Sequence, residues 1–236
     1  MYRGLRVSVV MPVYNEKENV RSAIDSFLLQ PSVDEIIAVD NNSTDESEQE
    51  IKKTNARYVL ETKQGYGAAL QRGMREATGD LIVTTEPDGT FFAEDIEKLL
   101  IYSLNFKVVF GTRTSQALIL SNANMKFPLR MGNWAVAKFL EFLFNGPSST
   151  DVGCTYKLIH RTAYEKIKDS FTVFGSWFSP EFMIRVLQNS ISCVEIPVHY
   201  KGRVGQSKIT GKLSKAIWLG LRMMWFIIAE RFLWRR

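Results

Sequence analysis

Short apolar runs rich in β-branched residues alternate with segments of helical periodicity along the first half of the chain. This alternation limits the fold more than any other feature. The runs predict strands at Val7–Met11, Glu35–Val39, Ala56–Leu60, Leu81–Thr85 and Lys107–Phe110. Strands and helices that alternate at this spacing form parallel βαβ units, and right-handed crossovers place the carboxyl ends of the strands on one edge. We therefore predict an α/β fold with a Rossmann-like, mostly parallel central sheet flanked by helices.

The second half of the chain is less regular. The sequence predicts helices at Gly132–Phe144 and Pro180–Gln188 and strands at Cys154–His160 and Ser192–Val198, after a basic, Asn-rich loop over 112–130. Hydrophobic residues make up 45% of the 236 residues and charged residues 23%, which is typical of a globular protein. No repeat or linker interrupts the pattern, so residues 1–236 are expected to form a single domain.

Polar side chains follow the predicted strands where each strand ends. Pro12 and Tyr14 follow the first strand, and Asp40 and Asn41 follow the second. In open α/β sheets, ligands bind in the crevice outside the carboxyl ends of the strands. The sequence therefore predicts a nucleotide-type site at this edge of the sheet.

Two carboxylates, Glu86 and Asp88, follow the run Leu81–Thr85 and precede Gly89. Residues i and i+2 of an extended chain point the same way, so both carboxylates can face one spot. Such a pair suits a hard divalent cation, which prefers oxygen ligands and can hold a substrate diphosphate. The alternative is a solvated turn, because Asp-Gly is a common turn pair.

The formal net charge is +5 and the sequence pI is about 9.1, which permits an anionic partner. Nucleic acid is not favoured, because the positive charge gathers near the C-terminal end beside apolar residues. The two cysteines fit no metal spacing and predict buried thiols in a reducing compartment. No leader and no apolar run of spanning length is visible, so we predict a cytoplasmic protein.

A series of motifs in this order resembles glycosyltransferase family 2, and the last three resemble its dolichyl- and polyprenyl-phosphate sugar synthase branch. The motifs are Val9–Glu16, Val39–Asp45, Lys63–Ala69, Gly73–Asp80, Glu86–Asp88, Gly111–Arg113, Asp151–Cys154 and Arg203–Lys208. The resemblance implies a GT-A fold. It also implies that residues 1–111 bind a nucleotide-diphosphate sugar, 112–210 bind the acceptor, and 211–236 form a C-terminal apolar helix.

The resemblance assigns roles to particular residues. It implies Mg²⁺ or Mn²⁺ bound at Glu86, Asp88 and Thr90. Catalytic roles fall to Asp88, Asp151, Arg203 and Lys208. Binding of the nucleotide sugar falls to Pro12, Tyr14, Glu16, Val39, Asp40, Asn41, Glu86, Pro87, Asp88, Arg113, Arg203 and Lys208.

Three departures from the family pattern affect these roles. Asn41 and Glu86 each stand where the family usually has Asp, and the segment between Arg203 and Lys208 is one residue shorter than usual. Asn41 can donate as well as accept hydrogen bonds, which leaves the base of the nucleotide open.

The branch implies an inverting transfer of the sugar to polyprenyl or dolichyl phosphate. A phosphate acceptor is already anionic at neutral pH and requires no general base. One alternative is transfer to a saccharide hydroxyl, for which Asp151 or Glu181 would have to act as base. A second alternative is a nucleotide-sugar-binding subunit without catalytic activity, which Glu86 in place of Asp would permit.

The C-terminal segment carries apolar residues at helical spacing over most of its surface, including Trp218, Trp225 and Trp234. Basic residues lie within and around it at Lys212, Lys215, Arg222, Arg231, Arg235 and Arg236. Tryptophans with terminal arginines are typical of a helix at a membrane interface. We therefore predict peripheral contact with the cytoplasmic face of a membrane. Packing against the domain or against a partner in a homodimer is the alternative.

Overall fold

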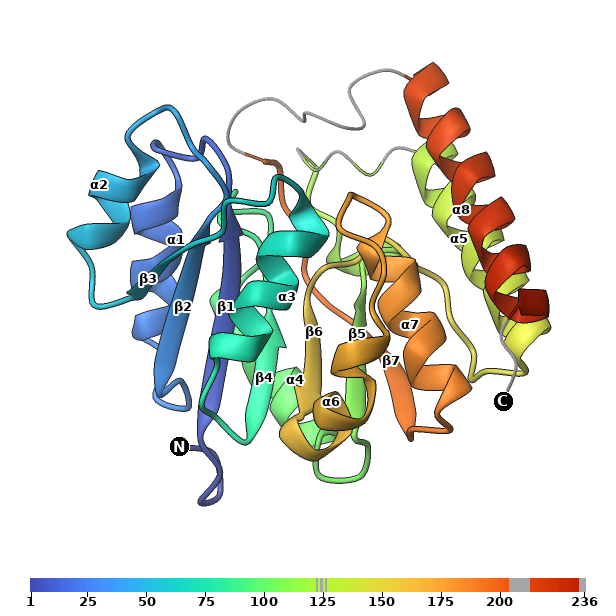
Figure 1. Cartoon of the computed structure of the whole chain (residues 1–236), viewed down its shortest axis with the longest axis horizontal. Helices are drawn as coiled ribbons and strands as arrows, with labels where there is room; N and C mark the ends of the chain where they lie inside the picture. The colour runs from blue at the N-terminus through green and yellow to red at the C-terminus, as the bar shows by residue number, and fades with distance from the viewer. Residues whose placement is uncertain (122, 124, 126, 204–212, 234–236) are drawn as a thin grey trace.

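The structure is a computed structural model of the chain that describes residues 1–121, 123, 125, 127–203 and 213–233. Its centre is a seven-stranded sheet in the order β3-β2-β1-β4-β6-β5-β7 (Figure 1). All strand pairs are parallel except those of β6, which runs antiparallel to β4 and β5. The predicted mostly parallel α/β sheet is confirmed.

The strands are β1 Val7–Val13, β2 Glu35–Asp40, β3 Arg57–Leu60, β4 Leu81–Thr84, β5 Val108–Thr112, β6 Lys157–His160 and β7 Cys193–Pro197. The helices are α1 Val20–Leu28, α2 Ser47–Lys52, α3 Tyr66–Glu76, α4 Ile96–Tyr102, α5 Phe127–Phe144, α6 Arg161–Ile167, α7 Phe178–Gln188 and α8 Leu213–Leu233. Short 3-10 turns occur at Ala93–Asp95, Gln116–Leu118 and Lys168–Ser170.

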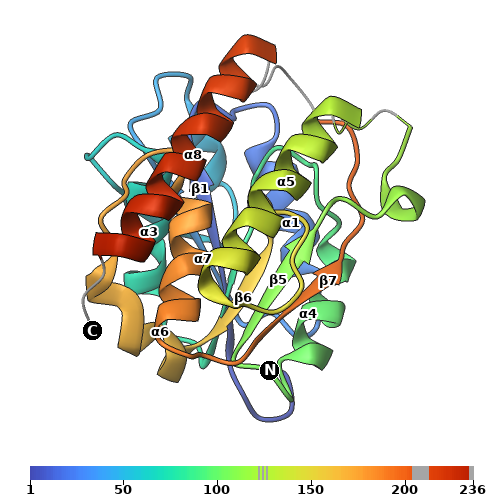
Figure 2. The same ribbon diagram turned by 90° about the vertical axis from the view of Figure 1, so that its right-hand side faces the viewer.

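Two apolar cores lie on opposite faces of the sheet, because successive strand residues point to opposite sides. On β1 and β4, Val10 and Ile82 belong to one core, and Val9 and Val83 to the other. The first core packs against α3, α5, α6 and α7, and the second against α1 and α4 (Figures 1 and 2). This sandwich fixes the strand ends and therefore the loops that follow them. The two cysteines, Cys154 and Cys193, are buried free thiols, as predicted.

Asn15 lies in the loop between β1 and α1. Asn15 has a left-handed backbone with φ of 52°, and its side-chain oxygen accepts a hydrogen bond from the Thr44 amide at 2.7 Å. The Asn15 amide donates to the Ser43 hydroxyl at 3.0 Å. These contacts join the loop after β1 to the loop after β2, so Asn15 connects two loops instead of capping a helix.

Strand β1 continues through Pro12, where the sequence predicts its end. Pro12 pairs with Val39 of β2, whereas on the other side β4 accompanies β1 only as far as Val10. Beyond Val10 that side of β1 is an edge, and an edge tolerates a residue without an N–H group. The strand predicted at Cys154–His160 is shorter in the structure, where only Lys157–His160 forms β6. Helix α6, which follows it directly, was not predicted from the sequence.

Helix α8 divides its apolar residues between the domain and the surface. Ile227 is fully buried, and Met223, Met224 and Phe226 pack against the first core. The other side carries exposed large side chains, namely Trp218, Leu221, Trp225 and Phe232. The described helices include none that is long and apolar enough to cross a membrane.

At Gly73, the backbone of α3 packs directly against side chains of the sheet. A Cβ atom there would lie 2.3 Å from Val10 Cγ1 and 2.9 Å from Val39 Cγ2. We expect Gly73→Ala to lower the free energy of unfolding by about 1–3 kcal/mol, because overpacking outweighs the gain in helix propensity. Gly132→Ala in α5 is the matched control, since nothing lies within 4 Å of its Cβ position. It should be neutral or stabilising in urea unfolding, and a stabilised Gly73→Ala would contradict the close packing.

Candidate active site

Three residues far apart in the sequence meet at the carboxyl edge of the sheet. Glu16 follows β1, Asp88 follows β4, and Arg203 follows β7. The Arg203 guanidinium forms an ion pair with the Glu16 carboxylate and lies 3.4 Å from Asp88 Oδ2. The Asn19 amide group also donates to Glu16 Oε2 at 2.8 Å. The structure thus brings together two predicted carboxylates and one predicted cation.

Asp88 is nearly fully buried and is oriented by its own loop. Its Oδ1 accepts hydrogen bonds from the Thr90 amide at 3.0 Å and from the Thr90 hydroxyl at 2.6 Å. Its Oδ2 faces Arg203. Thr90, predicted as a metal ligand, acts here as the residue that orients Asp88.

Glu86 lies two residues before Asp88 and is partly buried. Burial, and then the nearby Asp88 carboxylate, raise the pKa of Glu86 to about 8, while Arg113 and Arg203 act in the opposite direction. The two carboxylates are therefore close enough to repel each other.

Asp151 and Arg113 form a buried ion pair. Arg113 donates to Asp151 Oδ2 from Nε at 2.8 Å and from its backbone amide at 3.0 Å, and to Oδ1 from Nη2 at 2.9 Å. The Gly153 amide donates to Oδ1 at 3.0 Å. Burial opposes ionisation of Asp151, but the charge and hydrogen bonds of Arg113 outweigh it and lower the pKa of the carboxyl group. Each carboxylate oxygen already accepts two hydrogen bonds, so Asp151 positions Arg113 and is poorly placed to accept a proton.

Glu181, the other candidate base, is also fully occupied. It is completely buried and accepts hydrogen bonds from the Thr172 amide and hydroxyl, both at 2.8 Å, and from the Val173 amide at 2.9 Å. Arg185 donates to it at 3.0 Å. Glu181 therefore holds the segment before α7 in place.

Asp40 and Asn41 bind neighbouring loops. Asp40 Oδ1 accepts from the Ser43 amide at 3.1 Å. The Asn41 amide group donates to the carbonyls of Glu61 at 2.9 Å and Lys63 at 2.8 Å, and its oxygen accepts from the Gly65 amide at 2.7 Å. Asn41 therefore fixes the loop between β3 and α3.

The remaining predicted residues occupy different positions. Pro12 and Val39 are buried partners in the sheet, Pro87 is buried, and Tyr14 is 41% exposed at the edge. Lys208 lies outside the described residues. The buried segment Cys154–Tyr156 reaches the same edge, because it precedes β6 and β6 runs antiparallel. Its position there was not predicted from the sequence.

The donor set fits a metal that is shared with a substrate. Among the described residues, no group of three or more His, Cys, Asp or Glu side chains could hold a metal ion. Mg²⁺ is usually bound by one or two carboxylates together with substrate phosphates. Asp88 and Glu86 provide such a pair, so a metal here would depend on a bound diphosphate for its other ligands.

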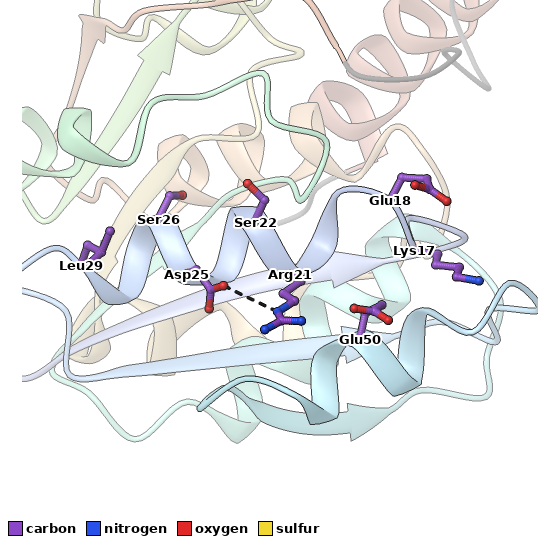
Figure 3. A pocket seen from close by; sticks show the side chains of 8 residues that line it. All are labelled: Lys17, Glu18, Arg21, Ser22, Asp25, Ser26, Leu29 and Glu50. Atoms are coloured by element: carbon purple, nitrogen blue, oxygen red, sulfur yellow. Dashed lines mark ion pairs between the residues drawn. The ribbon is translucent and has the colours of Figure 1, made fainter.

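A surface hollow is lined by residues of α1, of the segments that flank it and of α2 (Figure 3). It is lined mainly by charged and polar side chains, namely Lys17, Glu18, Arg21, Ser22, Asp25, Ser26, Leu29 and Glu50. Arg21 and Asp25 form an exposed ion pair within it. None of the predicted site residues lines this hollow, so it is not the candidate active site.

A family model described as glycosyl transferase family 2 matches residues 8–168, which is more than half of the chain. The chain belongs to glycosyltransferase family 2. This confirms the predicted family and the coarser activity, transfer of a sugar from a nucleotide sugar. The carboxylates and arginines described above are therefore the active-site candidates of a glycosyltransferase.

Relatives of similar length support the assignment. A dolichyl-phosphate hexose transferase of Haloferax volcanii is 28% identical over 206 residues, which is 86% of each chain. An uncharacterised glycosyltransferase of Mycobacterium tuberculosis is 25% identical over 235 residues, covering 96% of this chain and 99% of its own.

Solved structures share the fold. Glucosyl-3-phosphoglycerate synthase of Mycobacterium tuberculosis, in complex with Mn²⁺ and UDP-glucose, has a TM-score of 0.72 at 19% identity. The likeness covers 97% of this chain and 79% of that one. The complex of that enzyme with Mn²⁺, UDP and glucosyl-3-phosphoglycerate has the same TM-score of 0.72 at 19% identity, over 97% of this chain and 80% of that one. The predicted GT-A fold is confirmed.

The buried pair of Asp151 and Arg113 gives a test of stability and its pH dependence. We expect Asp151→Asn to lower the free energy of unfolding by about 3 kcal/mol at pH 7, because a buried arginine loses its partner charge. The pKa of Asp151 is depressed in the folded state, so its ionisation stabilises the protein fully above the unfolded pKa of about 3.9. That contribution is lost as pH falls through the folded pKa.

The difference between wild type and variant should therefore shrink below about pH 4, as measured by urea unfolding over a pH series. Asp25→Asn is the control, because its pairing with Arg21 is exposed and should contribute little. A difference for Asp151→Asn that grows on acidification would contradict this account.

Proposed function

We propose that the protein is an inverting, metal-dependent hexosyltransferase that transfers its sugar to a lipid phosphate of the polyprenyl or dolichyl class. The observation that carries the proposal is that both candidate bases, Asp151 and Glu181, have their oxygens engaged by buried hydrogen bonds. A saccharide hydroxyl needs a base to remove its proton. A phosphate acceptor is already ionised and needs none. The similarity to a dolichyl-phosphate hexose transferase supports the same acceptor.

The reaction is a single in-line displacement. A phosphate oxygen of the acceptor attacks the anomeric carbon, and the bond from that carbon to the β-phosphate oxygen breaks. The electron pair of that bond leaves with the nucleoside diphosphate. Because the attack comes from the side opposite the leaving group, the anomeric configuration is inverted. Bound Mg²⁺ or Mn²⁺ supplies Lewis-acid stabilisation of the diphosphate oxygens. Asp88 and Glu86 would hold the metal, and Arg203 and Arg113 would stabilise the negative charge on the leaving group.

The surface of α5 and α8 is consistent with a lipid acceptor. These helices lie side by side (Figures 1 and 2), and each carries a row of exposed apolar side chains. On α5 they are Phe127, Met131, Trp134 and Phe142, and on α8 Trp218, Leu221, Trp225 and Phe232. Arg130, Arg222 and Arg231 are on the same two helices. Apolar rows with basic residues favour contact with anionic lipid headgroups, and such contact would present a lipid phosphate to the domain.

The acceptor class can be tested directly. The purified protein is incubated with a panel of nucleotide sugars, Mn²⁺, and either a short polyprenyl phosphate or the matching polyprenol without phosphate. We expect glycosylated lipid only with the phosphate, and at least about a hundred-fold less with Asp88→Asn, which removes a main electrostatic stabiliser. Transfer to the polyprenol or to a free saccharide would show that a base is available. Undiminished activity in EDTA would exclude the metal.

Membrane contact can be tested without unfolding the protein. The side chains of Trp225 and Phe232 are 71% and 75% exposed, so replacing both by Ser should leave the core intact. We expect the variant to sediment with anionic vesicles at least about ten-fold more weakly than wild type, because two apolar side chains are lost from the interface. Leu29→Ser, which changes an apolar residue just after α1 that is 79% exposed, is the control and should bind like wild type. Equal binding of all three proteins would favour the alternative, a homodimer contact.

A further inference from the structure

Two buried hydroxyl groups at the carboxyl edge make no hydrogen bond within the described part of the chain. They are the phenol of Tyr66, at the start of α3, and the hydroxyl of Thr155, just before β6. Thr155 itself is only 7% exposed. Buried polar groups are nearly always paired, because an unpaired one is desolvated without compensation. Such groups beside an active site therefore call for a partner that arrives with the substrate.

The register of the sheet places Thr155 beside Glu86. Strands β4 and β6 are antiparallel, with Thr84 opposite Lys157. If the same register is extended past this pair, Glu86, two residues after Thr84, lies opposite Thr155, two residues before Lys157. Alternation keeps Glu86 and Thr155 on the same face as Thr84 and Lys157. The Thr84 hydroxyl donates to the Thr155 carbonyl at 2.6 Å, which ties the two segments together beyond the last paired residues.

Tyr66 reaches the same place from α3, which covers this face of the sheet. The Tyr66 phenol lies close to the Glu86 carboxylate and to the Thr155 hydroxyl, but not in hydrogen-bonding geometry with either. Tyr66, Glu86 and Thr155 thus form one polar cluster. We call these three residues the hydroxyl cluster.

The chemistry of the hydroxyl cluster matches a polyhydroxylated ring. Its carboxylate accepts hydrogen bonds from ring hydroxyls, and its two hydroxyls can each donate and accept. An apolar ligand would leave both hydroxyls unpaired. A hexose attached to a diphosphate at Asp88 satisfies all these groups.

We propose that Tyr66 and Thr155 are sugar-recognition residues, which bind hydroxyl groups of the donor hexose together with Glu86 and so help to select it. This inference rests on the proposed function, because it requires a nucleotide sugar at Asp88. It assigns the two hydroxyl groups of Tyr66 and Thr155 to the sugar, so we expect the free nucleoside diphosphate not to depend on them.

The test compares affinities for a sugar nucleotide and for the matching nucleoside diphosphate. Calorimetry with Mn²⁺ uses the pairs UDP-glucose with UDP and GDP-mannose with GDP. We expect Tyr66→Phe and Thr155→Val each to weaken binding of the preferred sugar nucleotide about three- to ten-fold, the usual effect of losing one hydrogen bond. Binding of the nucleoside diphosphate should not change.

Stability separates recognition from a structural role. Removing an unpaired buried hydroxyl should leave the unfolding midpoint of the ligand-free protein unchanged or raise it by about 1–3 °C. The control is Thr85→Val. The Thr85 hydroxyl is equally buried and unpaired, but alternation along β4 puts it on the opposite face with Val83. Thr85→Val should keep wild-type affinity for the sugar nucleotide.

The outcomes are distinct. If nucleoside diphosphates bind and the two cluster variants weaken both members of a pair equally, or neither, the sugar assignment is wrong while the proposed function stands. Variants that are destabilised without ligand and unchanged in the affinity ratio would show that the hydroxyls support the fold. If none of the four probes binds to wild type, the nucleotide-sugar function and the inference both fail.

Discussion

Electrostatic repulsion at the carboxyl edge of the sheet is the constraint on which the site depends. The segments after β1 and β4 and the segment before β6 bring Glu16, Glu86, Asp88 and Asp151 into one region. Arginines compensate three of these charges, since Arg203 pairs with Glu16 and approaches Asp88, and Arg113 pairs with Asp151. None of the ion pairs within the described residues includes Glu86. Its raised pKa follows from this difference, because burial and Asp88 act on a carboxylate that has no arginine of its own.

The same balance explains how the edge can receive a diphosphate. A diphosphate and its metal ion bring both negative and positive charge. Arg203 interacts with the carboxylates of Glu16 and Asp88, and a metal ion bound at Asp88 would release Arg203 to interact with the diphosphate. Asp151 is different, because it accepts three hydrogen bonds from Arg113 and a fourth from the Gly153 amide. Arg113 is therefore a fixed positive charge and Arg203 an exchangeable one. The two arginines identified by the sequence motifs have different physical roles in the site.

The parallel half of the fold could be predicted from the sequence because its signals are local. Apolar runs at Val7–Met11 and Leu81–Thr85 fix strands, and parallel crossovers then place Asp88 at the ligand edge. The features that could not be predicted depend on contacts between segments far apart in the sequence. Asn15 reads locally as a helix cap but binds the loop after β2. Thr155 reaches the edge only because β6 runs antiparallel, and strand direction leaves no mark in a short apolar run.

Asn41 shows how one departure from the family pattern is linked to the next. Its amide group donates to the carbonyls of Glu61 and Lys63, which an aspartate could not do. Its oxygen accepts from Gly65, whose φ of 145° and close approach to the Phe174 carbonyl admit no side chain. Gly65 directly precedes Tyr66, so Asn41 fixes the start of α3 from which the Tyr66 phenol extends toward Glu86. Asn41, which replaces an aspartate of the family, therefore positions the loop that carries Tyr66. Glu86, which replaces another, lies close to the Tyr66 phenol.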